Sequence, residues 1–103
     1  SVEDERLRVD ALLIISRTRT ELDDRAGATL AGDEVKKAVD GIRSSLDRTS
    51  VLADLAIAEA LAGRDGQTLF AQALAELRDM NDNWARARML AKAATTLFVL
   101  RGL

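Results

Sequence analysis

Apolar residues recur along this chain at intervals of three and four, which is the spacing of one face of an α-helix. Polar or glycine-containing segments interrupt the pattern at four places, so the sequence predicts five helices joined by short connections. The expected helices cover about residues 3–23, 33–46, 50–62, 67–80 and 83–101. We expect residues 1–103 to form a single all-α domain in which the helices pack as antiparallel hairpins.

The first expected helix is apolar over an unusually large part of its surface. One stripe at helical spacing consists of Leu7, Ala11, Ile14, Ile15, Thr18 and Leu22. Leu12 and Leu13 widen this stripe, and Asp10 and Ser16 are the only polar residues from position 9 to position 16. We therefore expect this helix to lie at the centre of the domain or against another protein chain.

Residues 25–32 interrupt the helical pattern. They contain two glycines and no charged residue after Arg25, which is typical of a loop. We expect this segment to be the most mobile connection, and we expect Asp33 to cap the helix that follows it. Asp82, in the polar turn before the last helix, is in position to cap that helix.

The last expected helix is also apolar on nearly every side. Its most regular stripe consists of Trp84, Ala87, Ala91, Ala94 and Phe98. Lys92 is the only charged residue between Met89 and Leu100. Two interpretations stay open: the helix lies in the centre of a bundle, or a second copy of the chain or another protein covers it.

Composition excludes several classes of function. His and Cys are absent, which removes the commonest catalytic and metal-binding side chains and any disulfide framework. The net charge of −2 offers no broad basic surface to a nucleic acid, and no apolar run reaches the ~20 residues of a membrane span. We expect a soluble, cytoplasmic protein that uses no cofactor and no metal ion and binds neither nucleic acid nor membrane.

Residues 47–102 resemble tetratricopeptide-like repeats. The matching segments are Leu69-Phe-Ala-Gln-Ala-Leu74, Asp82-Asn-Trp-Ala-Arg-Ala87 and Leu90-Ala-Lys-Ala-Ala94. The resemblance implies a scaffold of stacked helical hairpins that binds proteins. The chain lacks the proline that usually separates such repeats, and its N-terminal half does not align with the pattern. An unrelated orthogonal bundle of five helices stays open beside a repeat stack.

A small all-α enzyme is one alternative function. Residues 7–17 faintly resemble the first helix of chorismate mutases, which act through Arg and Glu electrostatics without His or Cys. The register from Asp to Arg differs here, and the lysine of that helix is absent. Such an enzyme predicts a polar pocket and a loss of activity when Arg8 or Arg17 is replaced by alanine.

Two further patterns indicate other functions. Glu76 and Asp79 have the spacing of a Mg²⁺ site on a helix, but Arg78 lies between them and no second acidic pair exists, which favours a solvated helix face. Residues 52–77 are compatible with a death-domain-like signalling bundle. That class predicts six short helices and contacts that weaken in salt.

The interpretation that fits the sequence best is a non-catalytic interaction or adaptor module that binds a protein partner or itself, as a homodimer, through apolar helix surfaces. The expected partner-binding residues are Leu12, Leu13, Trp84, Arg86, Phe98, Val99, Arg101 and Leu103. The apolar members would supply the affinity, since full burial of a large apolar side chain is worth about 1.5–3 kcal/mol. The arginines would lie at the rim and set specificity.

Overall fold

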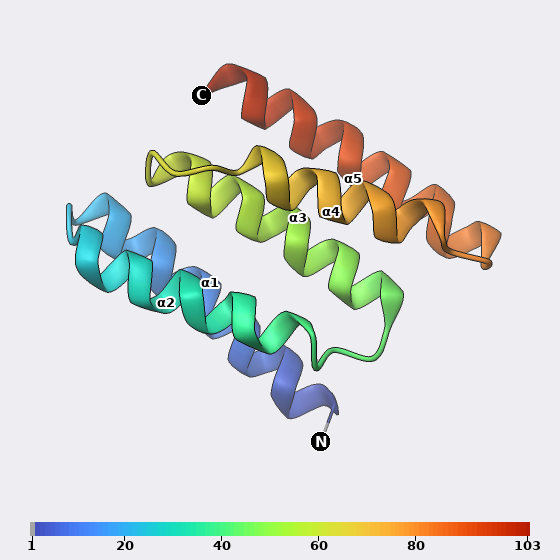
Figure 1. Cartoon of the computed structure of the whole chain (residues 1–103), viewed down its shortest axis with the longest axis horizontal. Helices are drawn as coiled ribbons and strands as arrows, with labels where there is room; N and C mark the ends of the chain where they lie inside the picture. The colour runs from blue at the N-terminus through green and yellow to red at the C-terminus, as the bar shows by residue number, and fades with distance from the viewer. Residues whose placement is uncertain (1) are drawn as a thin grey trace.

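A computed structural model describes residues 2–103 of the chain. These residues form helices α1 (Val2–Glu21), α2 (Arg25–Val39), α3 (Ser45–Leu61), α4 (Gln67–Arg78) and α5 (Asn83–Gly102) (Figure 1). No β-strand occurs in this part of the chain. The prediction of an all-α fold is therefore confirmed.

The helices form two layers in which consecutive helices alternate in direction (Figure 1). Helices α1, α3 and α5 run in the same direction with α3 in the middle, and α2 and α4 lie over them and run the opposite way. Helix α2 contacts α1 and α3, while α4 contacts α3 and α5. The molecule is a slab of 40 × 35 × 16 Å whose thickness corresponds to two layers, since packed helix axes lie about 8–10 Å apart. The predicted antiparallel hairpins are thus present.

The expected loop over residues 25–32 is wrong, because this segment forms the first half of α2. Asp24 starts the helix: its Oδ1 accepts a hydrogen bond from the backbone N–H of Gly27 at 2.9 Å. Asp33 consequently lies inside the helix and does not cap it. The helix also ends at Val39, earlier than the sequence pattern predicted.

The two glycines in α2 serve close packing rather than a turn. A Cβ atom at Gly32 would lie 2.6 Å from Oε1 of Glu59 on α3 and 2.8 Å from Nη2 of Arg64. A Cβ atom at Gly27 would meet the side chains of Arg19 and Asp24. Small residues therefore let α2 approach its neighbours, and this gain in packing outweighs their low helix propensity of about 1 kcal/mol each.

Helix α1 packs into the domain through the residues opposite its main apolar stripe. Val9, Leu13 and Ser16 are buried, and the Ser16 hydroxyl donates a hydrogen bond to a carbonyl of α2. Leu7 and Ile14, which belong to the stripe, face solvent. The sequence identified the stripe correctly but could not determine that it lies on the outside of the slab.

The hydrophobic core follows the middle helix. Val51, Leu55 and Ala56 of α3 are fully buried and pack with Val35 of α2 and Val9 of α1. A second, smaller cluster consists of Leu77, Met80 and Met89 and lies where α4 turns into α5. Because α3 contacts each of the other four helices, it holds the two hairpins and α5 together.

Candidate functional site

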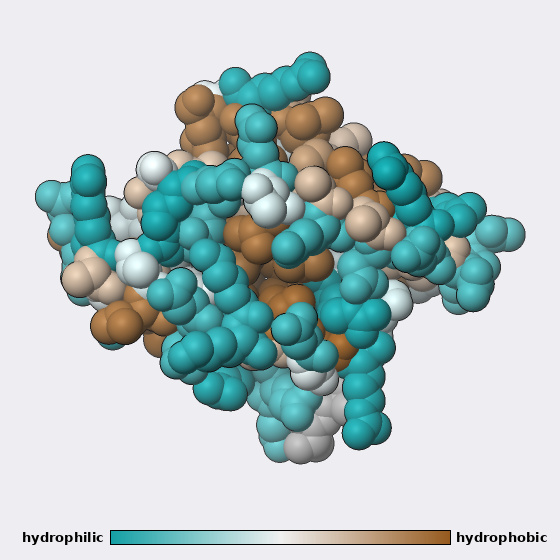
Figure 2. Space-filling view, in the orientation of Figure 1, coloured by the Kyte–Doolittle hydropathy of each residue, from teal (hydrophilic) through white to brown (hydrophobic). Residues whose placement is uncertain are grey.

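Helix α5 exposes apolar side chains along its whole length. We call the exposed residues Trp84, Ala87, Leu90, Ala91, Ala94 and Phe98 the outer face of α5. Trp84 is 65% exposed and Phe98 is 80% exposed. The helix buries Met89 and Thr96 on the opposite side, so its regular apolar stripe points away from the domain. In Figure 2, apolar patches (brown) lie along the upper edge of the molecule, over α5, between hydrophilic side chains (teal).

The charged residues of α5 are all basic: Arg86, Arg88, Lys92 and Arg101. The Arg88 guanidinium lies over the ring of Trp84, 5.3 Å from its centroid, which is a cation–π contact. Lys92 points to α3, where its Nζ lies 3.0 Å from Asp54 Oδ1 and 2.7 Å from Ser50 Oγ. The outer face is thus edged by positive charge.

The start of α5 is fixed by a cap that the sequence predicted. Asp82 Oδ1 accepts hydrogen bonds from the backbone N–H groups of Trp84 at 2.9 Å and Ala85 at 3.1 Å. This confirms the role of Asp82, which satisfies two backbone N–H groups in the first turn of the helix.

Helix α1 carries a second exposed apolar surface at the opposite side of the slab. We call Leu7, Ala11, Ile14, Ile15 and Leu22 the outer face of α1. Ile14 is 66% exposed and Leu22 is 74% exposed. Exposed Glu3 and Glu21 flank this face on one side, because they are five full helical turns apart and share the edge next to Leu7 and Ile14.

The structure separates the expected partner-binding residues into three groups. Those that are exposed are Trp84, Arg86, Phe98, Arg101 and Leu103. Leu12 and Val99 are half-buried. The assignment of Leu13 as a partner-binding residue is wrong: it is only 6% exposed and belongs to the main core, because α1 turns this side toward the domain.

Four exposed residues of the two outer faces are not among the partner-binding residues that the sequence predicted: Leu7, Ile14, Leu22 and Leu90. The stripe in α1 contained the signal for the first three, since helical spacing groups them on one face. What was missing was the direction in which that face points.

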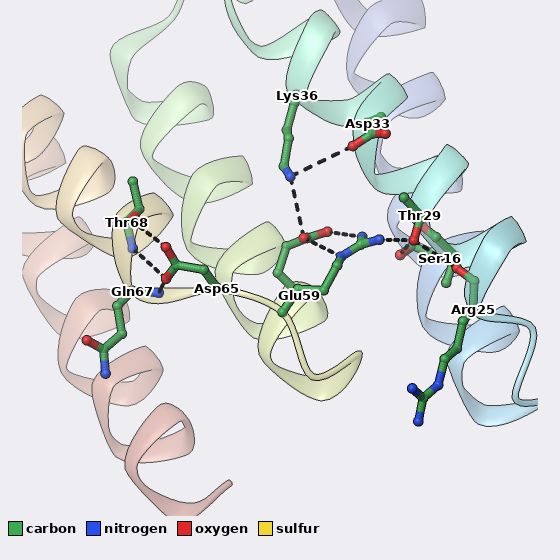
Figure 3. A network of polar contacts seen from close by, with 11 residues as sticks. Ser16, Arg25, Thr29, Asp33, Lys36, Glu59, Asp65, Gln67 and Thr68 are labelled. Atoms are coloured by element: carbon green, nitrogen blue, oxygen red, sulfur yellow. Dashed lines mark hydrogen bonds and ion pairs between the residues drawn. The ribbon is translucent and has the colours of Figure 1, made fainter.

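A polar network joins the two hairpins on the inside of the slab (Figure 3). Its centre is Glu59 of α3, which is only 1% exposed. The Glu59 carboxylate accepts hydrogen bonds from Nε and Nη2 of Arg64, the first at 2.7 Å, and from Nζ of Lys36 on α2 at 3.4 Å. Arg64 also donates to the Thr29 hydroxyl of α2. No local pattern in the sequence marks these residues as neighbours.

Glu59 also affects the ionisation of Arg64. The hydrogen bonds that Arg64 donates to the Glu59 carboxylate, followed by the charge of that carboxylate, raise the pKa of the Arg64 guanidinium. No buried side-chain polar atom in the described residues lacks a hydrogen-bond partner. A hollow of about 420 Å³ lies beside the network and is lined by Thr20, Asp23, Arg25, Thr29 and Arg64, among others. The carboxylate in this lining is that of Asp23, whose Oδ1 lies 3.9 Å from Nε of Arg25.

The residues that carried the alternative functions pair with other side chains or face solvent. Arg8 pairs with Glu34 of α2 at 3.4 Å, and Arg17 is exposed. Both oxygens of Glu76 bind Arg48 of α3, at 2.9 Å and 3.1 Å, and Glu76 raises the pKa of Arg48. Across residues 2–103 no group of three or more acidic side chains could hold a metal ion. The same residues form five helices, not the six of a death-domain-like bundle.

The chain matches no protein-family model, no curated protein and no solved structure. None of the helices in the described part of the chain combines the length and the apolar composition needed to cross a membrane. The surfaces described above are therefore the basis on which a function can be argued.

Proposed function

We propose that this chain is a non-catalytic protein-interaction module, built as a stack of helical hairpins, that binds its partner through the outer faces of α5 and α1. One observation carries the proposal: the outer face of α5 leaves a row of apolar residues open to solvent, with Phe98 80% exposed. Contiguous apolar patches on a soluble domain commonly mark sites of protein contact.

The composition of the outer face of α5 suits a protein contact. Trp84 supplies a large, rigid apolar surface, and tryptophan is enriched among the residues that contribute most to binding energy at interfaces. The Arg88 guanidinium packs over one face of its ring. The helix is 20 residues long and so presents this surface over about 30 Å. The small residues Ala87, Ala91 and Ala94 would let a partner helix approach closely.

The arrangement of the helices supports a repeat-like scaffold. Consecutive antiparallel hairpins that stack in two layers are the architecture of helical-repeat proteins, in which each unit contacts only its neighbours. This agrees with the tetratricopeptide-like sequence of residues 47–102. The network around Glu59 would keep the first hairpin in a fixed position against the second, so that the binding surface is pre-organised.

Selection of peptides from a random phage-displayed library tests this proposal. Wild-type protein is the bait, Phe98→Glu is the counter-bait, and Gln72→Glu is the matched control, since Gln72 is an exposed residue of α4 and the variant adds the same charge. The sole tryptophan, Trp84, lies on the face in question and reports binding by its fluorescence.

We expect peptides that bind wild type and Gln72→Glu equally and lose at least about tenfold in affinity for Phe98→Glu. Circular dichroism should show that all three proteins are folded, because Phe98 contributes little to the core. The proposal is overturned if the enriched peptides do not distinguish wild type from Phe98→Glu, or if Phe98→Glu unfolds.

A further inference from the structure

We infer that the partner of the outer face of α5 is the outer face of α1 on a second copy of this chain, so that α5 of each copy lies beside α1 of the next. This inference rests on the proposed function and names the occupant of that surface. The contact is heterologous: it uses a different surface on each of the two copies, and each copy keeps one free face through which a further copy can bind.

The fold already contains the geometry of this contact. Helix α3 packs against α1 on one side and against α5 on the other, and all three run in the same direction (Figure 1). Placing α1 of a second copy beside α5 repeats this parallel packing once more. The two helices that would meet have equal lengths of 20 residues, so their faces match from end to end.

Charge distinguishes this pairing from the alternatives. Every charged residue of α5 is basic, so two α5 helices would bring arginines together. Helix α1 carries charges of both signs, including the exposed Arg8 and Arg17, but its first turn is acidic, and Glu3 and Glu21 flank its outer face on one side. In a parallel arrangement this acidic first turn lies near Arg86 and Arg88 at the start of α5. Opposite charges also meet where α1 and α3 pack inside the domain, since Arg6 of α1 binds Asp47 of α3 at 3.2 Å.

The available apolar area is sufficient for a weak but specific contact. An aromatic side chain offers about 200 Å² in total, so the exposed parts of Trp84 and Phe98 supply about 300 Å². Leu90 and the alanines of the same face extend this area toward the ~800 Å² that each partner of a standard interface buries. We therefore expect association in the micromolar range.

Analytical ultracentrifugation of two blocked variants tests the inference. Ile14→Glu blocks the outer face of α1, and Phe98→Glu blocks the outer face of α5, both at exposed positions that the fold does not need. The proteins are measured alone and as an equimolar mixture, from about 10 µM to about 1 mM. Gln72→Glu again serves as the control for added charge.

For wild type and Gln72→Glu, we expect a mass that rises with concentration past that of a dimer. Each blocked variant should stay monomeric, because every contact needs one intact face of each kind. The mixture should form a dimer and stop there, since one α5 face and one α1 face remain.

Two results would overturn the inference. A monomeric wild type over the whole range excludes self-association, and a dimer of Ile14→Glu that is lost in Phe98→Glu shows that α5 pairs with α5. Neither result changes the expected outcome of the peptide selection, so that experiment tests the proposed function independently of self-association.

Discussion

Replacement of Glu59 by glutamine tests whether the inner network holds the two hairpins together. Glu59 is the buried centre of this network, and its carboxylate binds the Arg64 guanidinium directly. The variant keeps the shape of the side chain and removes its charge. One of its two oxygens becomes an NH₂ group, which cannot accept a hydrogen bond and which would point at a guanidinium or an ammonium group.

The size of the expected loss in stability depends on the hydrogen bonds that Glu59 accepts and on how exposed Arg64 and Lys36 are. A hydrogen bond to a charged group contributes about 1.5–3 kcal/mol, and removal of one member of a fully buried ion pair costs about 3–5 kcal/mol. The side chains of Arg64 and Lys36 are 27% and 43% exposed, so both can regain water. We therefore expect Glu59→Gln to lower the free energy of unfolding by about 2 kcal/mol.

Urea unfolding followed by circular dichroism measures this change, and the m-value shows whether unfolding stays two-state. A loss of about 2 kcal/mol corresponds to a fall in Tm of about 8–16 °C for a domain of this size. The control is Glu34→Gln, whose partners Arg8 and Lys37 are largely exposed, and we expect a change below about 0.5 kcal/mol there. Equal changes in the two variants would refute the argument that burial gives the Glu59 network its strength.

Two more predictions concern the faces of α1 and the start of α4. Leu13→Ala should lower the free energy of unfolding by about 2–4 kcal/mol, whereas Ile14→Ala should change it by less than about 0.5 kcal/mol. The reason is that Leu13 is in the core and Ile14 faces solvent. Urea unfolding measures both changes, and similar losses in the two variants would contradict this prediction. Hydrogen bonds from the Thr68 hydroxyl and backbone lower the pKa of Asp65 from its ordinary value of 3.8, so its contribution to stability is present above that pH and disappears as the pH falls through the lowered pKa. The difference in the free energy of unfolding between wild type and Asp65→Asn should accordingly shrink on acidification, and a difference that grew would contradict the assignment.

The helices themselves were predictable because local signals suffice for them. Apolar spacing located α1, α4 and α5 closely, and Asp82 was recognisable as a cap from its place in a polar turn. The start of α2 was not predictable in this way. Gly27 and Gly32 resemble loop residues when only local propensity is considered, and their role as points of close approach depends on side chains of other helices.

In the candidate site, too, some residues could be predicted from local sequence and others could not. The outer face of α5 contains the stripe from Trp84 to Phe98 that the sequence displays, so all of its residues except Leu90 could be grouped in advance. The Glu59 network could not, because its members come from α2, α3 and the connection after α3, and no local pattern marks them as neighbours. Only folding brings Lys36 and Arg64 to the same carboxylate.

By itself, the sequence determined that this chain is all-α, that its helices form hairpins, and that α1 and α5 are apolar on most of their sides. The tertiary structure determined which side of each helix is buried. In α1 the buried residues are Val9, Leu13 and Ser16, and the broader stripe with Ile14 remains outside. The physical reason is that periodicity defines a face but not its direction: a helix that is apolar on several sides buries the side that fits its neighbours, and its remaining apolar surface is left for a partner.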